Sequence, residues 1–399
     1  MLNNLKTITI YIISSLFIIF SAGALAENWH YSIIVNAGSS GSRLHLFRYN
    51  ADTSLPVIED MPLDPNNKTN VALDSFAKDP NNVKSSLDPL FNTAITALKN
   101  EGVAPQTVPV SILGTAGMRR LPLNEEQAIY NTISDYLKKP PYSFTSVTAR
   151  TITGKEEGIY DWLDVNYLAK NFNNSQPTLG CIDMGGASME IVFATQPADN
   201  ENITTLIVNK QKYTLYSKSI LGLGQDDARK NIGDPETSAS CYPSGYAEYP
   251  LSPSIQGNFK FDTCKDLYDT KILRKLLAKN DLLAIPRQQK FIAFGSIFYS
   301  FKFFAPGSTT EQATQPLKEA TLENNIKSIC TMSWQDLKQQ YSTDNYLAND
   351  CANGVYIDEL LFGANGYQLQ DSQLFKISNT LNQKPIDWAL GAILNQLIT

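Results

Sequence analysis

The sequence predicts an α/β protein built from two related domains, and two observations support this prediction. A strand, a loop of small residues and a second strand occur over residues 31–49, and the same arrangement recurs over residues 179–193. Between the two copies, strand patterns alternate with helical ones, as in α/β folds. With 399 residues, 43% of them hydrophobic, the chain is long enough to build a core for each domain.

The first copy is a β-hairpin with a glycine-rich turn. The apolar run Tyr31–Val35 is followed by the loop Asn36–Ser42 and by Arg43–Tyr49, in which apolar and polar residues alternate. A strand rather than a helix follows the loop, and no Gly-Lys-Ser/Thr sequence is present there. The loop is therefore not the phosphate-binding loop of P-loop NTPases.

The second copy repeats this hairpin 147 residues later. Apolar runs at Leu179–Ile182 and Met189–Phe193 flank the loop Asp183–Ser188, in which Asp183 stands where the first copy has Asn36. Either loop alone is more simply explained as a tight turn. The matched pair favours two domains that each present a loop of small residues.

The rest of the chain supplies the elements around these hairpins. Apolar spacing predicts helices over residues 87–98, 125–137 and 387–398, the last of which closes the fold, and a strand over residues 108–113. Segments rich in Asn and Pro at residues 62–82 and 234–256 are predicted as surface loops. We place domain I at residues 27–150 plus 378–399 and domain II at residues 151–377.

The amino terminus has the pattern of a signal peptide over residues 1–26. Lys6 precedes an apolar run from Ile8 to Phe20, and Ala24 and Ala26 form a cleavage site that predicts a mature start at Glu27. An uncleaved membrane anchor is the alternative, but the apolar run is short for a bilayer span. We expect a secreted or periplasmic protein with no membrane span after cleavage.

Composition excludes several kinds of chemistry. Lys and Arg number 33 against 39 acidic residues, a net charge of −6, so nucleic acid is not expected as a partner. A Ser/His/Asp triad or a His-rich zinc site would have to use His30 or His45, the two histidines of the chain. We therefore expect carboxylates, hydroxyls and backbone amides to perform the chemistry.

The five cysteines should mostly pair in an oxidising compartment. Cys241 with Cys264 and Cys330 with Cys351 would each close a short loop, although the sequence alone does not fix the pairing. Cys181, in the apolar run of the second hairpin, is then left over and is predicted as a buried strand residue rather than a nucleophile.

The two hairpin loops suggest a site for phosphate groups. Loops of Gly, Ser and Ala expose successive backbone N–H groups, which form an anion-binding concavity. Asp183 at the head of one loop could hold a divalent cation through water, and phosphate oxygens would complete the coordination. Two such loops facing each other would bind a polyphosphate chain between the domains.

Two further segments add to this site. Gly114–Arg120 places small residues and a basic pair at a strand end, where ligands bind in α/β folds. Gly154–Trp162 contains the acidic pair Glu156 and Glu157, and a glutamate near a bound phosphate can accept a proton from an attacking water. The first turn of a helix, which favours acidic residues, explains the same pair.

Five segments in this order resemble the five apyrase conserved regions of the nucleoside triphosphate diphosphohydrolase (apyrase, ecto-ATPase) family: 36–43, 114–119, 154–158, 183–188 and 294–299. The chain is most similar to soluble secreted bacterial members, such as those of Legionella. The resemblance implies two RNase H-like domains of the actin/Hsp70/sugar-kinase superfold with the nucleotide between them. It also implies hydrolysis of nucleoside tri- and diphosphates to monophosphates with Mg²⁺ or Ca²⁺, by a protein expected to be a monomer.

The resemblance also implies roles for individual residues. Glu157 matches the catalytic base and Ser188 the serine that orients the attacking water, while Asp183 and, through water, Asn36 match the metal site. Residues that match the phosphate and nucleotide contacts are Ser39, Ser40, Gly41, Ser42, Arg43, Thr115, Gly185, Gly186, Ala187 and Glu190. Tyr346 and the pair Phe298–Tyr299 are candidates for stacking on the base, although aromatic residues at such places are more often core.

The sequence departs from the family pattern at two positions, Asn36 in place of the usual Asp and Glu190 in place of the usual Gln. An amide supplies no negative charge, and a lost ionic hydrogen bond is worth roughly 1.5–3 kcal/mol, or about ten- to hundredfold in rate. Glu190 could restore the charge nearby. We expect Asn36→Asp to raise metal-dependent turnover, and a nucleotide-binding protein with weakened catalysis is the alternative function. A sugar kinase of the same superfold is disfavoured by export and by the acidic pair.

Overall fold

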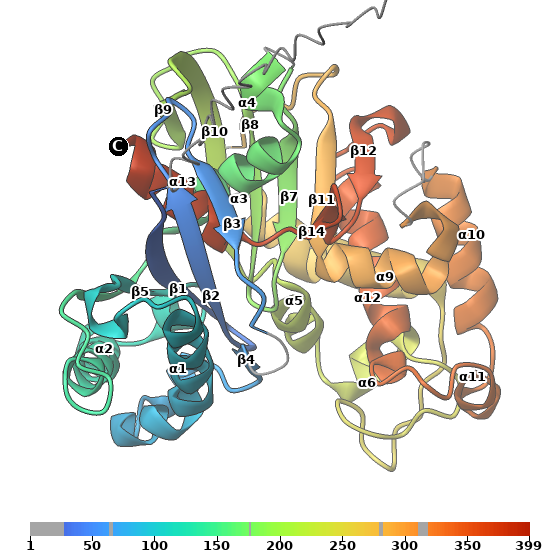
Figure 1. Cartoon of the computed structure of the whole chain (residues 1–399). Coiled ribbons are helices and arrows are strands. Elements are labelled where there is room, and N and C mark those ends of the chain that lie inside the picture. The colour runs from blue at the N-terminus through green and yellow to red at the C-terminus, as the bar shows by residue number, and fades with distance from the viewer. Residues whose placement is uncertain (1–27, 64–66, 175–176, 279–281, 310–317) are drawn as a thin grey trace, which may run out of the picture.

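Two six-stranded sheets form the centre of the computed structural model (Figure 1). The structure describes residues 28–63, 67–174, 177–278, 282–309 and 318–399. The predicted signal peptide, residues 1–26, lies outside the described residues. In the described part of the chain, no helix is both long enough and apolar enough to cross a bilayer.

The first sheet contains the first predicted hairpin and has the strand order β3-β2-β1-β5-β6, with β4 paired to β2. Strands β1, β2 and β3 pair antiparallel, whereas β1, β5 and β6 pair in parallel. The strands are β1 (His30–Gly38), β2 (Gly41–Asn50), β3 (Val57–Asp60), β4 (Lys68–Thr69), β5 (Val110–Gly114) and β6 (Val147–Thr151).

The second sheet has the same plan, with the order β10-β8-β7-β11-β12 and β9 added beyond β10. Here β7, β8 and β10 pair antiparallel, and β7, β11 and β12 pair in parallel. The strands are β7 (Gly180–Met184), β8 (Ser188–Ala194), β9 (Ile203–Val208), β10 (Gln211–Leu221), β11 (Phe291–Gly295) and β12 (Leu374–Ile377), while β13 (Thr380–Leu381) and β14 (Lys384–Pro385) form a small separate sheet. The repeated order confirms the predicted two-domain α/β fold.

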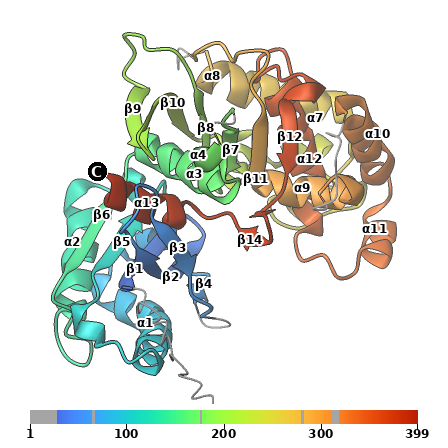
Figure 2. The ribbon, with the colours of Figure 1, turned by 45° about the horizontal axis from the view of Figure 1, so that its top comes forward.

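Two helices cross between the sheets. Helix α3 (Gly154–Leu168) follows the last strand of the first sheet but packs on β7, β8 and β10 of the second. Helix α13 (Trp388–Ile398), which was predicted to close the fold, follows the second sheet and packs on β1, β2 and β3 of the first. The two helices also pack against each other, so the domains share a central layer (Figure 2).

Burial of apolar residues produces three cores. The central core joins α3 and α13 to the facing sides of both sheets and includes Trp162 and Ile393. The outer face of the first sheet packs on α1 (Val83–Asn100) and α2 (Leu123–Leu137). The outer core of the second sheet includes residues of α5 (Gln225–Asn231), α7 (Phe261–Tyr268), α9 (Ser296–Phe304), α10 (Glu319–Cys330) and α12 (Leu347–Phe362).

Short helices complete the second domain, and two disulfides link other elements of it. The short helices are α4 (Asn171–Asn174), α6 (Pro235–Ser238), α8 (Arg274–Leu276) and α11 (Trp334–Gln340). Cys241 is bonded to Cys264 and Cys330 to Cys351, so the pairing expected from sequence is confirmed. Cys181 is free and buried in β7, also as predicted.

The two segments predicted as surface loops are only partly loops. Residues 62–82 contain β4, which pairs with β2, and the buried Leu73. In the 234–256 segment, Tyr242 and Tyr246 are buried and stacked with ring centroids 5.3 Å apart. The prediction was wrong for these parts because Asn and Pro content reports local turns and does not report contacts with distant elements.

Candidate active site

The two predicted loops are the turns of the β1–β2 and β7–β8 hairpins, and their registers match. Asn36 lies opposite Arg43 in the first hairpin, and Asp183 lies opposite Glu190 in the second. The same 147 residues separate Asn36 from Asp183 and Arg43 from Glu190. The structure thus places four side chains at equivalent positions of the two repeats, with a different charge pattern in each.

The tips of the two hairpins come close together. A Cβ atom on Gly186 would lie 3.2 Å from the Ser39 Oγ of the opposite loop, so a larger residue there would push the loops apart. Among the described residues, the backbone N–H groups of Ser39, Ser40 and Gly186 have no hydrogen-bond acceptor. These donors are available to an anion, as the composition of the loops predicted.

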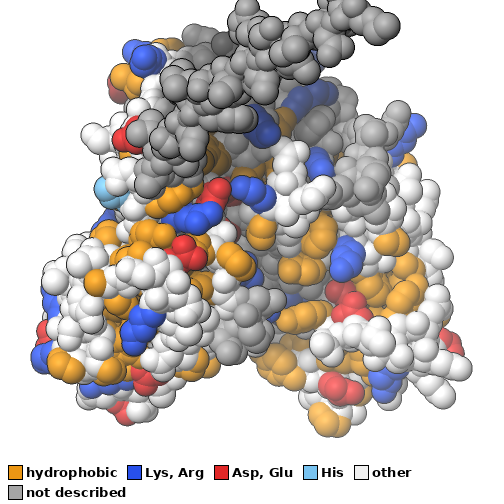
Figure 3. Space-filling model, viewed as in Figure 1, with side chains coloured by type: hydrophobic (Ala, Val, Ile, Leu, Met, Phe, Trp, Pro, Cys, Tyr) orange, Lys and Arg blue, Asp and Glu red, His pale blue; other side chains and the backbone are white. Residues whose placement is uncertain are grey.

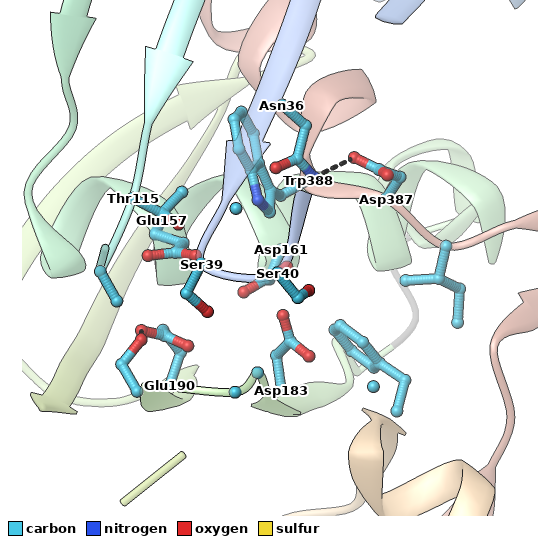
Figure 4. A pocket seen from close by; sticks show the side chains of 18 of the residues that line it. Asn36, Ser39, Ser40, Thr115, Glu157, Asp161, Asp183, Glu190, Asp387 and Trp388 are labelled. Atoms are coloured by element: carbon cyan, nitrogen blue, oxygen red, sulfur yellow. Dashed lines mark hydrogen bonds between the residues drawn. The ribbon is translucent and has the colours of Figure 1, made fainter. Parts of the chain in front are cut away.

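A cavity of about 280 Å³ lies between the loops (Figure 4). The predicted site residues that line it are Asn36, Ser39, Ser40, Arg43, Thr115, Glu157, Asp183, Gly185, Gly186, Ser188 and Glu190. The predicted stacking candidate Tyr299 also lines it. Five predicted residues that the structure also describes do not, namely Gly41, Ser42, Ala187, Phe298 and Tyr346. Side chains that sequence reasoning did not assign also line it, among them Asp161, Asp387 and Trp388.

The acidic pair at the start of α3 divides between the two roles considered for it. Glu156 forms a capping box with Thr153 at the helix amino terminus and pairs with Arg150. Glu157 faces the cavity instead, where it is only 6% exposed. Its carboxylate binds the guanidinium of Arg119, a residue of the predicted basic pair. Burial is the main cause that raises the pKa of Glu157, and the nearby Glu190 raises it further.

Glu190 lies beside Glu157 and is held by hydroxyl groups. The Ser188 Oγ donates to the Glu190 Oε1 at 2.7 Å, and the Ser219 Oγ donates to the same oxygen at 2.6 Å. Arg119 Nη1 also donates to the Ser219 Oγ at 3.2 Å. Arg119 therefore connects the first sheet to two acidic side chains of the second domain, whereas its place at a strand end suggested a contact with a ligand.

Asp183 and Asp161 face the same part of the cavity (Figure 4). A Cβ atom on Gly295 would lie 2.5 Å from the Asp183 Oδ1, and Gly295 has a φ of 66°, so glycine is needed at this strand end. Asp161 is one helical turn after Glu157 and is 1% exposed. Burial raises the pKa of both aspartates. Asp183 raises the pKa of Asp161 further, and Glu190 and Asp387 raise that of Asp183.

Asn36 is held by a cluster that the sequence did not reveal. Its Nδ2 donates to the Asp387 Oδ1 at 3.0 Å, which leaves its Oδ1 as the acceptor (Figure 4). Asp387 also caps α13 by accepting from the Ala389 N–H at 3.1 Å. Its other oxygen lies 3.2 Å from the His45 Nε2, and the His45 Nδ1 lies 2.8 Å from Asp60. These two carboxylates raise the pKa of His45 to about 10, so His45 is a buried cation with a structural role.

The cavity has an excess of negative charge, because five carboxylates and one guanidinium, that of Arg43, line it. A polyanion can enter such a cavity only with a cation. The two buried oxygens of Asp161 also have no hydrogen-bond partner within the described residues, so they are available to such a cation. In the same residues, no three acidic, His or Cys side chains come close enough to hold a metal ion directly. The donor set fits a hydrated divalent cation, held through water by carboxylates.

Two aromatic candidates for base stacking differ in their positions. Tyr299, on α9, lines the cavity and is 64% exposed. Tyr346, at the start of α12, is 72% exposed and does not line it. On the face of the molecule shown in Figure 3, acidic and basic side chains are interspersed.

This architecture defines a class of protein, the two-domain proteins with RNase H-like domains of the actin/Hsp70/sugar-kinase superfold, here with an acidic cavity between two glycine-rich hairpins. Sequence comparison narrows the class. The chain belongs to the GDA1/CD39 (nucleoside phosphatase) family, whose sequence profile matches residues 23–398. It is therefore an enzyme of the nucleoside phosphatase type, as the resemblance indicated.

Named relatives cover nearly the whole chain. It is 27% identical to "Probable apyrase 5" of Arabidopsis thaliana over 96% of this chain and 86% of the relative. It is 25% identical to "Ectonucleoside triphosphate diphosphohydrolase 1" of Bos taurus over 93% of this chain and 82% of the relative.

Solved structures support the fold. A nucleoside triphosphate hydrolase from Neospora caninum aligns with a TM-score of 0.60 at 14% identity, covering 93% of this chain and 92% of the other. A Ppx/GppA family member from Aquifex aeolicus aligns with a TM-score of 0.53 at 12% identity, covering 92% and 98%. At these identities the likeness concerns the fold alone.

Proposed function

We propose that this chain is a secreted apyrase that hydrolyses nucleoside tri- and diphosphates to monophosphates with the help of Mg²⁺ or Ca²⁺. The observation that carries the proposal is the placement of Glu157 in a cavity whose walls are two hairpin loops with free N–H donors. Loops of this kind bind phosphate oxygens, and a buried glutamate beside them can act on a water molecule.

In this proposal Glu157 is the general base. It accepts a proton from the water whose oxygen attacks the terminal phosphorus, while the bond from that phosphorus to the bridging oxygen breaks. A raised pKa favours this role, because a base of higher pKa takes up the proton more readily. Arg119 fixes the Glu157 carboxylate in the cavity, and Ser188 contributes a hydroxyl that can orient the same water.

The phosphate chain would be held by both domains. Ser39, Ser40 and Thr115 of the first domain and Gly186 of the second line the cavity. We assign their N–H groups and the Thr115 hydroxyl to the phosphate oxygens. Asp183 and the Oδ1 of Asn36 would hold the cation through water. When bound, the cation would neutralise phosphate charge and assist departure of the leaving nucleoside di- or monophosphate.

Phosphate release by the mature protein tests this function. A panel of nucleoside tri-, di- and monophosphates, each with Mg²⁺, Ca²⁺ or EDTA, should show release from tri- and diphosphates and loss of release in EDTA. Glu157→Gln should bind nucleotide with unchanged affinity and release no phosphate. Wild-type turnover in this variant would remove Glu157 as the base.

Asn36 favours one alternative function, a nucleotide-binding protein with weakened catalysis. Its amide lacks the negative charge that the family usually has at this position, and its Nδ2 is already bound to Asp387. Tight nucleotide binding without phosphate release, in any of the three conditions, would support that alternative.

Export belongs to the same proposal. Cleavage before Glu27 predicts a mature chain that begins there, and mass spectrometry of the protein recovered outside the cytoplasm tests it. The two disulfides are consistent with an oxidising compartment. A protein recovered with residues 1–26 intact would contradict the proposed cleavage.

A further inference from the structure

Asp161 is a buried carboxylate that the chemistry proposed so far does not use. It lies on α3 one turn after Glu157, is 1% exposed, and lines the cavity between the hairpins. In the described parts of the chain, neither of its carboxylate oxygens has a hydrogen-bond partner. An unpaired buried carboxylate is unfavourable, so a ligand that it binds would relieve a cost that the protein alone leaves in place.

Other carboxylates of the cavity are already engaged. Glu157 is bound to Arg119, and Glu190 accepts from two serine hydroxyls. Asp387 accepts from the Asn36 amide and the Ala389 N–H, and its other oxygen lies 3.2 Å from the His45 Nε2. Of the carboxylates that line the cavity, Asp161 is the one whose two oxygens are both buried and unpaired within the described residues, and Asp183 faces the same space (Figure 4).

The number of negative charges that the two hairpins bring to this part of the cavity also requires explanation. The first hairpin presents the neutral Asn36 where the second presents Asp183, so the hairpin heads together carry one negative charge. Asp161 lies between them as a second one, and it comes from a helix rather than from a hairpin (Figure 4).

We propose that Asp161 is a further carboxylate of the divalent-cation site and supplies the negative charge that Asn36 lacks. The cation is held through its water molecules by Asp161 and Asp183, because the described acidic side chains do not gather closely enough to bind a bare ion. This inference rests on the proposed function, since it concerns the cation of that reaction.

The direct test measures Mn²⁺ binding to the mature protein without nucleotide, from the electron paramagnetic resonance signal of free Mn²⁺. Asp161→Asn keeps the shape of the side chain and should weaken Mn²⁺ binding about 10- to 100-fold, the usual effect of losing a residue that acts on a metal through its shell. Asp164→Asn is the matched control. Asp164 is also buried on α3, but it does not line the cavity, and its Oδ2 accepts from the Asp387 N–H at 2.9 Å. Mn²⁺ affinity should be unchanged in this control.

A second measurement separates cation binding from a structural role. In EDTA, Asp161→Asn should melt at the same temperature as the wild type or higher, because the variant removes an unpaired buried charge. With Mn²⁺ added, the wild type should gain more thermal stability than the variant. Equal Mn²⁺ affinity in the two proteins, equal loss in the Asp164→Asn control, or absence of Mn²⁺ binding to the wild type would each overturn the proposal.

Phosphate release by the wild type distinguishes failure of this inference from failure of the proposed function. If the wild type hydrolyses nucleotides in a cation-dependent way but Asp161→Asn binds Mn²⁺ normally, the assignment of Asp161 is wrong and the function stands. If the wild type releases no phosphate from any nucleotide, the function itself is wrong.

Discussion

Replacing Asn36 by Asp tests how the first hairpin is held. The sequence predicts a higher turnover for this variant, and the structure adds that its stability should fall. The Asn36 Nδ2 donates to the Asp387 Oδ1 at 3.0 Å, so Asn36→Asp removes a donor and places two carboxylates in contact. A lost hydrogen bond to a charged group is worth about 1.5–3 kcal/mol. Two like charges about 4 Å apart repel by about 4 kcal/mol at an effective dielectric constant of 20.

His45 and Arg43 offset part of this repulsion, because their positive charges lie 3.2 Å and 3.5 Å from the other oxygen of Asp387. We therefore expect Asn36→Asp to lower the free energy of unfolding by about 3 kcal/mol at pH 7 in EDTA, the sum of these effects after compensation. Urea denaturation with a common slope for both proteins measures the difference.

The double variant Asn36→Asp with Asp387→Asn exchanges the amide and the carboxylate. It restores a donor and an acceptor at the same contact, so it should recover part of the lost stability beyond the sum of the single changes. The expected rise in metal-dependent turnover is best measured in this variant, where the cation site gains a charge without the repulsion. A single Asn36→Asp variant as stable as the wild type in EDTA would refute this account of the contact.

Three further predictions concern other parts of the chain. Because the pKa of His45 is raised to about 10, its contribution to the free energy of unfolding is complete below pH 6.5 and is lost as pH rises towards 10. The urea midpoint of the wild type should therefore fall between pH 6 and pH 10. The midpoint of His45→Gln should change less over the same range. Arg119→Met leaves Glu157 as an unpaired buried charge and should lower stability by about 3–5 kcal/mol, and adding Glu157→Gln should recover stability but not phosphate release. Replacing Cys330 and Cys351 by Ala opens the bridge between α10 and α12 and should lower the free energy of unfolding by about 3 kcal/mol. The KM for nucleotide should stay unchanged, because neither residue lines the cavity.

Local sequence features were enough to predict the hairpins, because the turn residues and the alternation of apolar side chains act over a few residues. The same holds for the acidic pair of α3: Glu156 forms the helix cap that the first-turn explanation predicted, and Glu157 lines the cavity, where its role as base stays a proposal. Asp161 could have been found from its spacing, since it follows Glu157 by one helical turn on the same face.

The cluster around Asn36 could not have been predicted from the sequence. Asp387 is 351 residues away in the sequence, at the start of the predicted closing helix, and the pattern of that segment assigned no role to its side chain. The sequence also could not predict that α3 and α13 pack on the opposite sheets. This packing depends on which faces of the sheets remain apolar once both sheets have formed. Composition also misplaced Tyr242 and Tyr246, whose burial depends on packing against a distant core.

The contact between Asn36 and Asp387 has a consequence for biosynthesis. It joins the first strand of the chain to the cap of its last helix, so the first hairpin cannot reach its final arrangement until residue 387 has left the ribosome. Contacts between such distant residues form late, because a long loop must close first. A growing chain therefore carries an incomplete cavity until residue 387 has been synthesised and has left the ribosome.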